Sequence, residues 1–369
     1  MPRFLAKVLL CAGFALVAGS ASAQTKLSYG SYLPPTHVNN TVGIEPMIKR
    51  MEKESGGKLT VESFPGGSVA KATAAVDSIR DGIVTAGMVV DTYVPKQLPH
   101  SFLVTELALL GRNSVVMSGA SNEFNLVACK ECLADQKKSG IISMAYYSTA
   151  PYTLMCKADL RSIADFKGKK IRSAGAYSIM FKSFGMVPVN VTSDETYEAM
   201  QRGQVDCTMG ADSWLKSYTL WDVAKNVLAT TIGTYHGGLL WGMNADAWAK
   251  LPADQKAILK KNMPILAADV TFGYLQESRD VHKAAGEKGV KFNPPDASWN
   301  SEYEAYLKNE IARVKEEGKK RGVPNADELV DRYLGLMKKW EKIDAEEIKG
   351  DRQKFVDALN REVFSKVSW

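Results

Sequence analysis

The stretch DFKGKKIRSAG, residues 165–175, contains a short β-strand pattern that ends at Arg172 and runs into a glycine turn. A helical pattern starts near Tyr177, and the next strand is expected over VPVNV, residues 187–191. A strand, a turn and a helix in this order form one unit of an α/β sheet. We therefore expect Arg172 at the carboxyl end of its strand, close to the positive end of a helix dipole, where an anion is favoured.

Arginine suits a carboxylate in particular, because its planar guanidinium donates two parallel hydrogen bonds. The alternative is a structural ion pair between Arg172 and Asp165 or Asp206, the acids that flank the unit. The three neighbouring lysines are expected to be surface charges; they are Lys167, Lys169 and Lys170. The stretch thus predicts an anion site at Arg172, unless an internal acid neutralises it.

Strands and helices alternate on both sides of this unit. Before it, strands are expected over 26–33, 58–64 and 84–90, with helices over 43–57 and 69–82. A second cycle starts with the strand YTLMCK at Tyr152, and further strands follow over 187–191 and 204–210. This alternation predicts α/β lobes with largely parallel sheets, whose ligands collect outside the carboxyl ends of the strands. Two such cycles predict a two-lobed, type II-like periplasmic binding protein fold.

The rest of the chain is expected to be helical after the strand 239–244. Pro252 suits the first turn of a long helix that runs to about residue 289, and charged helices follow it. We expect lobe I over 24–149 plus about 237–275 and lobe II over 150–236. The C-terminal helices, about 276–369, are expected to pack across lobe II and the hinge.

The N-terminus has the pattern of an export signal. Arg3 and Lys7 precede an apolar run from Val8 to Ala18, and small residues end at Ala23. This predicts a cleaved signal peptide over 1–23 and a periplasmic protein, because the run is too short to span a membrane. Removing its two cations leaves 45 Lys plus Arg against 41 Asp plus Glu, a net charge of +4. The cations alternate with acids, which argues against a nucleic-acid partner.

Four cysteines remain after such cleavage, and in an oxidising compartment they can form two disulfides. Three pairings are possible on paper. The proximity of Cys129 and Cys132 favours a local bridge, which leaves Cys156 and Cys207 to join two strands if these are neighbours. A redox CxxC motif and a zinc site are the alternatives, and the sequence lacks the strand before the motif or the second ligand pair that they require.

Three motifs resemble the extracytoplasmic substrate-binding proteins of TRAP transporters, the dicarboxylate-binding DctP type. They are FPGGSVAKA (64–72), DLRSIADFKGKKIRSAG (159–175) and, after an eleven-residue spacing, VPVNVTSDETYEAMQRGQVDC (187–207). The resemblance covers about residues 26–256. It implies two lobes that close over an organic acid, a long helix across both lobes, and Arg172 as the residue that holds the ligand carboxylate. It also implies small and large integral membrane subunits as partners.

The sequence departs from this family at three places. Tyr152 stands near the position of a second arginine, Gly210 stands where many members have asparagine, and the turn 68–72 reads SVAKA. With fewer polar anchors and more aromatic residues, the chain is expected to bind a less polar monocarboxylate, aromatic or branched. The alternative is that these aromatic side chains belong to the lobe cores.

Strand ends and lobe crossings supply the other candidate ligand-binding residues. In lobe I these are Tyr32, His37, Ser68, Asp91, Thr92 and Tyr93; in lobe II they are Tyr152, Ser173, Gly210, Asp212 and Trp214, with Tyr235 and His236 at the crossover. Either histidine could donate to a carboxylate, and the alternative is that it lies on the surface. No catalytic residue, metal ligand or cofactor is expected.

Two other functions remain possible. An enzyme is disfavoured because the four histidines are scattered and there is no HExxH, GxSxG or P-loop motif. A binding protein for an ATP-driven importer, or a sensor for a small carboxylate, would have similar lobes. The KIR segment and the long helix favour the TRAP type.

Overall fold

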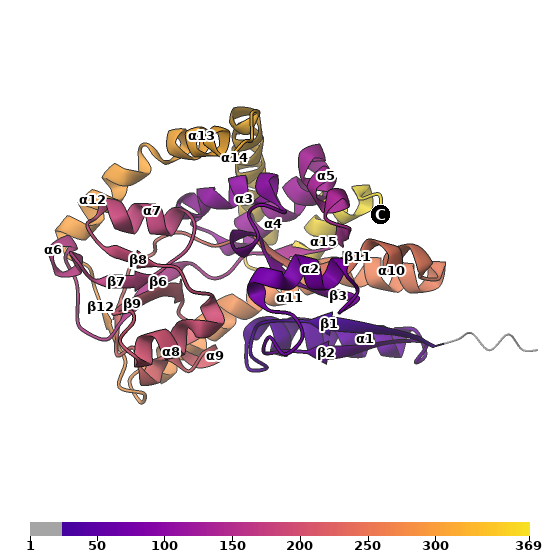
Figure 1. The fold of residues 1–369 in the computed structure, drawn as a ribbon, viewed down its shortest axis with the longest axis horizontal. Helices are drawn as coiled ribbons and strands as arrows, with labels where there is room; N and C mark the ends of the chain where they lie inside the picture. The colour runs from indigo at the N-terminus through magenta and orange to yellow at the C-terminus, as the bar shows by residue number, and fades with distance from the viewer. Residues whose placement is uncertain (1–23) are drawn as a thin grey trace, which may run out of the picture.

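The structure, a computed structural model, describes residues 24–369. It contains two separate sheets, each flanked by helices, which lie side by side along the long axis of the molecule (Figure 1). The expected two-lobed α/β fold is therefore confirmed. The expected signal peptide, 1–23, lies outside the described residues. Among residues 24–369, no helix is both long enough and apolar enough to cross a bilayer.

The first sheet has the strand order β2–β1–β3–β11–β4, and β5 also pairs with β11. Strand β1 is parallel to β2 and β3, whereas β11 is antiparallel to its neighbours β3, β4 and β5. The strands are β1 (Thr25–Gly30), β2 (Leu59–Phe64), β3 (Ala86–Val90), β4 (Ile141–Ser143), β5 (Tyr146–Tyr147) and β11 (Gly238–Asn244).

The second sheet has the strand order β12–β10–β6–β9–β7–β8. Strand β7 is parallel to β8 and β9, and β6 is antiparallel to β9 and β10. The strands are β6 (Tyr152–Cys156), β7 (Lys170–Arg172), β8 (Val187–Val189), β9 (Cys207–Ala211), β10 (Asn226–Leu228) and β12 (Lys291–Asn293).

Each sheet contains one reversed strand, which the expected parallel pattern omitted. Strands β6 and β11 each follow a crossing of the chain from one lobe to the other, so they start at the interlobe boundary and run away from it. The other strands run toward that boundary. Because ligands bind beyond the carboxyl ends of such strands, this topology directs both sheets at one shared cleft.

Fifteen α-helices lie among the described residues. Those that flank the first sheet are α1 (Glu45–Glu54), α2 (Ala75–Arg80), α3 (Pro99–Thr105), α4 (Ser114–Glu123), α5 (Lys130–Lys138) and α10 (Ala245–Lys250). Those of the second lobe are α6 (Ile163–Phe166), α7 (Ala176–Ser183), α8 (Thr196–Gln201) and α9 (Trp214–Ser217). The remaining five are α11 (Ala253–Ala284), α12 (Ala297–Leu307), α13 (Glu310–Lys320), α14 (Ala326–Ile343) and α15 (Arg352–Glu362).

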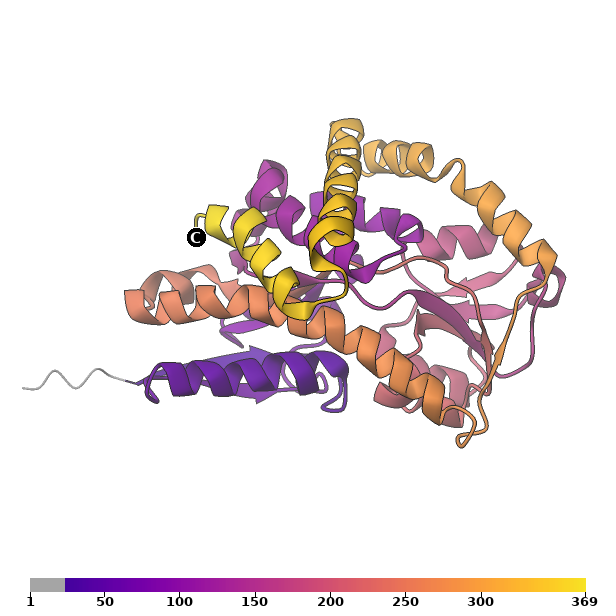
Figure 2. The same ribbon diagram turned by 180° about the vertical axis from the view of Figure 1, so that it is seen from behind.

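Helix α11 connects the two lobes (Figure 2). Its 32 residues correspond to about 48 Å. Near its start Lys261 pairs with Glu54 of α1, and near its end His282 pairs with Asp212 of the second lobe. The helix continues through Pro264, so one helix extends from the first lobe to the second.

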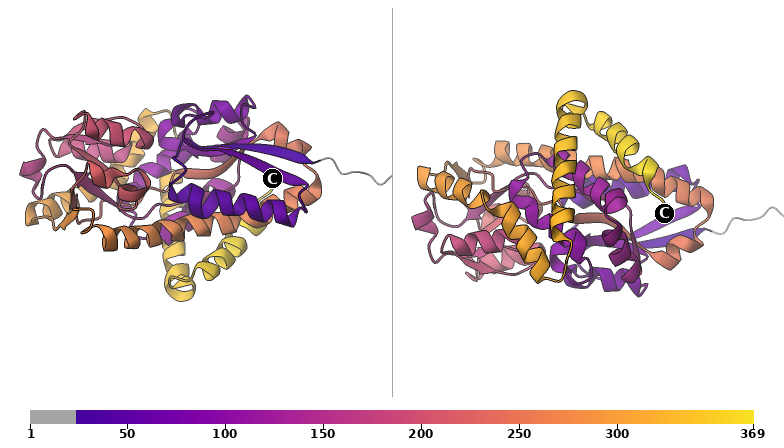
Figure 3. Two further views of the ribbon diagram at one scale, coloured as in Figure 1. Left: turned by 90° about the horizontal axis from the view of Figure 1, so that it is seen from below. Right: turned by 90° about the horizontal axis from the view of Figure 1, so that it is seen from above.

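The C-terminal helices differ from the expected placement across lobe II and the hinge. Helix α12 packs on α6 of the second lobe, but α14 packs on α4 and α3, and α15 packs on α11. The view from above in Figure 3 shows α14 running across the long axis near the middle of the molecule. Helix α14 packs closely on α4 because Gly119 of α4 leaves room for the Trp340 ring of α14. The indole N–H of Trp340 also donates to Glu123.

Both disulfides that the cysteine spacing suggested are present. Cys129 pairs with Cys132 at the start of α5. Cys156 pairs with Cys207, and these two residues face each other in the antiparallel β6–β9 register. The second bridge thus joins the strand that enters lobe II to a central strand of its sheet.

Candidate ligand-binding site in the interlobe cleft

Arg172 is the last residue of β7, opposite Val189 of β8 and Thr208 of β9. Three residues further on, Gly175 has φ 56° and forms the N-cap of α7. Glycine adopts this left-handed conformation without steric cost, which lets the chain turn directly from strand to helix. The turn places the arginine at the carboxyl end of the strand, as predicted.

Among residues 24–369 no acid forms an ion pair with the Arg172 guanidinium, although the residue is only 2% exposed; Asp194 and Glu195 lie further away and feel its charge. Its Nε donates to the carbonyl oxygen of Val191 at 3.1 Å, and Nη2 donates to the Tyr93 hydroxyl at 2.7 Å. Asp165 instead caps α6, and Asp206 accepts from the Lys170 N–H. The alternative that Arg172 pairs with one of these acids is therefore wrong.

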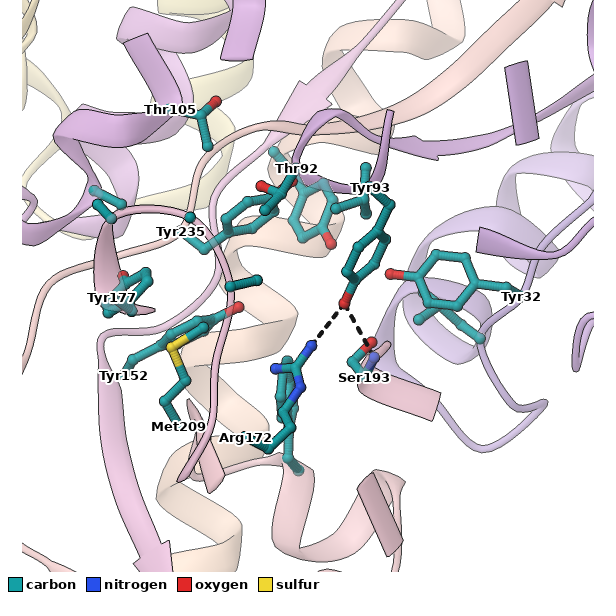
Figure 4. A pocket seen from close by; sticks show the side chains of 18 of the residues that line it. Tyr32, Thr92, Tyr93, Thr105, Tyr152, Arg172, Tyr177, Ser193, Met209 and Tyr235 are labelled. Atoms are coloured by element: carbon teal, nitrogen blue, oxygen red, sulfur yellow. Dashed lines mark hydrogen bonds between the residues drawn. The ribbon is translucent and has the colours of Figure 1, made fainter. Parts of the chain in front are cut away.

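The Arg172 side chain lines a pocket between the two lobes. Both lobes and α11 contribute to its wall, which is mainly aromatic (Figure 4). The aromatic lining residues are Tyr32, His37, Tyr93, Tyr147, Tyr152, Tyr177, Trp214, Tyr218, Tyr235 and Tyr274. The site therefore combines one buried cation with a large apolar surface.

Trp214 occupies the space that a larger residue at position 210 would take. Its ring packs directly on Gly210, and a Cβ at that position would collide with the ring. The ring centroid lies 5.6 Å from the guanidinium carbon of Arg172 and 5.5 Å from that of the Tyr152 ring. Gly210 itself does not line the pocket. Its contribution is to place an aromatic ring beside the cation, where an asparagine could not sit without displacing it.

The Tyr93 hydroxyl connects the two lobes. It belongs to the 3-10 turn Asp91–Tyr93 that follows β3, and it accepts hydrogen bonds from Arg172 Nη2 at 2.7 Å and the Ser193 N–H at 3.0 Å (Figure 4). Both donors belong to the second lobe. Because these two bonds use the oxygen's two lone pairs, the hydroxyl proton is free to donate in a third direction.

The two predicted histidines have different positions. His37 lines the pocket, where burial lowers its pKa to about 3. Its Nδ1 accepts from the Asn39 N–H at 3.2 Å, so the proton lies on Nε2, which is 3.3 Å from the Tyr274 hydroxyl. His236 lies outside the pocket, stacked on Tyr333, and burial lowers its pKa to about 4. Only His37 is placed to contact a ligand, and it is neutral.

Eight of the predicted residues line the pocket, and six do not. The lining residues are Tyr32, His37, Thr92, Tyr93, Tyr152, Arg172, Trp214 and Tyr235. The others are Ser68, Asp91, Ser173, Gly210, Asp212 and His236. Ser68 donates to the Pro65 carbonyl within its own turn, and the Ser173 hydroxyl lies 2.9 Å from that of Ser178.

The two predicted aspartates turn into their own lobes. Asp212 accepts from the Thr153 hydroxyl and pairs with His282 of α11. Asp91 accepts from the hydroxyls of Thr105 at 2.6 Å and Tyr235 at 3.2 Å, and burial raises its pKa to about 7. Both aspartates therefore lie behind the wall of the pocket. Asp91 holds the Tyr235 side chain in place, and Asp212 links strand β6 to helix α11 through Thr153 and His282.

Several lining residues had not been predicted. They include Thr105, Glu106, Tyr147, Tyr177, Ser193, Met209, Tyr218 and Tyr274. Ser193 lies two residues after the end of a predicted strand, and Tyr147 directly precedes the first lobe crossing, so strand ends and crossings are a usable signal for these two. Glu106 and Tyr274 lie in helical segments that have no such signal.

Two α/β lobes with a pocket between them are the architecture of solute-binding proteins. A family model described as "Bacterial extracellular solute-binding protein, family 7" matches residues 29–315, and the chain belongs to this family. Among relatives, a solute-binding protein of Albidiferax ferrireducens is 25% identical over 57% of this chain. That alignment spans 61% of the relative, which is less than two thirds of its length.

Solved structures share the fold at low sequence identity. A TRAP solute-binding protein from Rhodoferax ferrireducens with copurified benzoate has a TM-score of 0.78 and 18% identity, covering 87% of this chain and 99% of that one. A marine metagenome TRAP protein in complex with metahydroxyphenylacetate has a TM-score of 0.77 and 22% identity, covering 86% and 100%. These proteins have the same two-lobed architecture.

Proposed function

We propose that this protein captures an organic acid between its lobes and delivers it to the membrane subunits of a TRAP-type transporter. One observation carries the proposal: the Arg172 guanidinium is buried, faces the pocket and has no internal acid as a partner among residues 24–369. A buried charge is costly unless it is paired, so the site favours a ligand that brings the opposite charge. Arginine pairs with a carboxylate through two parallel hydrogen bonds.

Tyr93 is proposed as the second donor to that carboxylate. Its free proton and the Arg172 guanidinium lie at the same point of the pocket, and the lobes must close for the two residues to meet. A ligand that binds both groups therefore favours the closed state over the open state. The Ser193 N–H supports Tyr93 in this position by donating to its hydroxyl oxygen.

The ligand body is proposed to be apolar and aromatic, with a single carboxylate. A charge-assisted hydrogen bond contributes about 1.5–3 kcal/mol, whereas micromolar affinity corresponds to about 8 kcal/mol, so burial of the ligand body must supply the larger part. The rings of Tyr152, Trp214 and Tyr235 provide that surface. The benzoate and metahydroxyphenylacetate complexes of the two structural relatives support this choice.

We place the protein in the periplasm, exported by cleavage after Ala23, with the small and large integral membrane subunits of a TRAP transporter as its partners. The family's extracellular description supports export. The two disulfides agree with an oxidising compartment.

Mass spectrometry of the compound released when the purified protein is denatured tests the proposal. We expect an aromatic monocarboxylic acid, and we expect that acid to bind again to refolded protein in calorimetry. A released compound without a carboxylate would contradict the proposal, as would the absence of heat with every acid in an aromatic, branched and dicarboxylic panel.

A further inference from the structure

Glu106 is an acid in the wall of the same pocket. It begins the 3-10 segment Glu106–Leu110 after α3, and it is 2% exposed. Its Oε2 lies 3.2 Å from Arg321 Nη1 and 3.8 Å from Arg313 Nη1, both on or next to α13. Among residues 24–369, Oε1 accepts no hydrogen bond. One oxygen of the carboxylate is thus held by arginines, and the other has no donor.

The free oxygen lies against the turn that follows Arg172. A Cβ at Gly175 would sit 2.6 Å from Glu106 Oε1, and Gly175 is itself a lining residue of the pocket. Only glycine leaves room for the carboxylate at this point of the wall. The Arg172–Gly175 turn therefore begins with the cation that faces the pocket and ends at the glycine that packs against Glu106 Oε1.

Two arginines on the side of Glu106 that faces α13, Arg321 and Arg313, balance its charge. Arg313 forms two hydrogen bonds with Glu310, at 2.7 and 2.6 Å, which leaves Arg321 as the main partner of Glu106. Burial raises the pKa of Glu106, and the charges of Arg321 and Arg313 oppose that rise. An ionised carboxyl oxygen can only accept hydrogen bonds, so a ligand group beside it must donate one.

We propose that Glu106 selects ligands that carry a second polar group besides their carboxylate. This group is a hydroxyl or an amino group of the ligand, and it donates a hydrogen bond to Glu106 Oε1. This inference rests on the proposed function, because it needs the ligand carboxylate at Arg172. A second carboxylate in that place would face Glu106 with the same charge. The site is therefore built for a hydroxylated or aminated aromatic monocarboxylate and against an aromatic dicarboxylate.

A site that hydrogen-bonds a ligand hydroxyl rejects the analogue that lacks it, because the buried acceptor is then left unpaired. The test is calorimetry of the full mature chain with benzoate, phenylacetate, their ring-hydroxylated and ring-aminated forms, and the benzenedicarboxylates. We expect the best hydroxylated or aminated acid to bind at least tenfold more tightly than its unsubstituted parent. We expect the benzenedicarboxylates to bind more weakly than benzoate.

The matched variants are Glu106→Gln and Glu310→Gln. Both belong to the same arginine cluster, but only Glu106 lines the pocket. In Glu106→Gln we expect the preference for the substituted acid to fall at least fivefold and dicarboxylate binding to strengthen relative to wild type. Glu310→Gln should leave the preference unchanged.

Wild-type protein that binds benzoate as tightly as every substituted acid would overturn the inference and leave the carboxylate site standing. This measurement needs no variant, so it remains decisive if Glu106→Gln fails to fold. An equal preference in wild type and a folded Glu106→Gln variant would also overturn it. Absence of binding by every acid in the panel would contradict the proposed function as well.

Discussion

The Arg172 Nη2 atom lies 2.7 Å from the Tyr93 hydroxyl oxygen, and the two residues come from opposite lobes. Arg172 ends a strand of the second sheet, whereas Tyr93 follows a strand of the first. The hydrogen bond therefore joins the two lobes across the pocket. The atoms that we assign to carboxylate binding are therefore the same atoms that join the lobes.

Tyr93→Phe is expected to weaken binding of the released acid about tenfold. The change removes the acceptor for Arg172 and Ser193 and one donor to the carboxylate, while it keeps the ring. A hydrogen bond to a charged group contributes about 1.5–3 kcal/mol, part of which water replaces. Calorimetry measures the affinity, and small-angle scattering should show a more open ligand-bound protein than wild type.

Tyr32→Phe is the control for this variant. Tyr32 lines the same pocket and packs edge-on against Tyr93 at 5.9 Å between ring centroids, but its hydroxyl does not bond Arg172. Its affinity should stay within about threefold of wild type. Equal losses in both variants would show that Tyr93 acts only as a wall of the pocket.

Asp91→Asn is expected to change how stability depends on pH. The pKa of Asp91 is raised to about 7 in the folded protein, against an ordinary value of about 3.9 in the unfolded chain. The folded state therefore binds the proton more tightly, and this contribution to stability is present at low pH and lost as pH rises through about 7. The free energy of unfolding of wild type minus that of Asp91→Asn should fall between pH 5 and pH 8.

Urea unfolding at several pH values measures that difference. Asp246→Asn, an exposed aspartate of α10, supplies the baseline for the loss of a carboxylate that is not buried. A wild-type-minus-Asp91→Asn difference that is flat across this range, or that rises, would show that Asp91 does not hold a proton in the folded protein.

The Cys156–Cys207 bridge is expected to stabilise the fold more than the Cys129–Cys132 bridge. The first joins residues 51 apart in sequence and the second joins residues 3 apart, so the first restricts the unfolded chain more strongly. The chain-entropy model gives a difference of about 2 kcal/mol. Urea unfolding of the two double Cys→Ala variants should show this order, and the reverse order would exclude the entropic explanation.

Local patterns were sufficient to predict the strand, turn and helix around Arg172, because all three depend on residues 165–185. The short strands β4, β5, β10 and β12 were missed. Strands β7 and β8 are equally short, but they were predicted because a glycine turn and a helix between them complete the pattern of an α/β unit. Helix α4 was also missed, because all ten of its residues are buried and it has no polar face. Reversal of β6 and β11 follows from the lobe crossings, which are a property of the whole chain.

The site was predictable where it depends on strand ends and not where it depends on lobe closure. Arg172 ends its strand, Tyr93 lies in the turn that follows its strand, and both line the pocket. Asp91 and Asp212 follow strands too, but hydroxyl donors within their own lobes turn them away. Glu106 reaches the pocket from a helical segment with no strand end nearby, so only the three-dimensional fold shows its position.

Calorimetry of Arg172→Lys with the released acid tests the central claim most directly. Lysine keeps the charge but not the planar pair of donors, so affinity should fall at least tenfold while the thermal midpoint stays close to that of wild type. Arg202→Lys, an exposed change in the same lobe, should bind like wild type. Unchanged affinity in a folded Arg172→Lys variant would contradict the assignment of Arg172 as the carboxylate-binding residue.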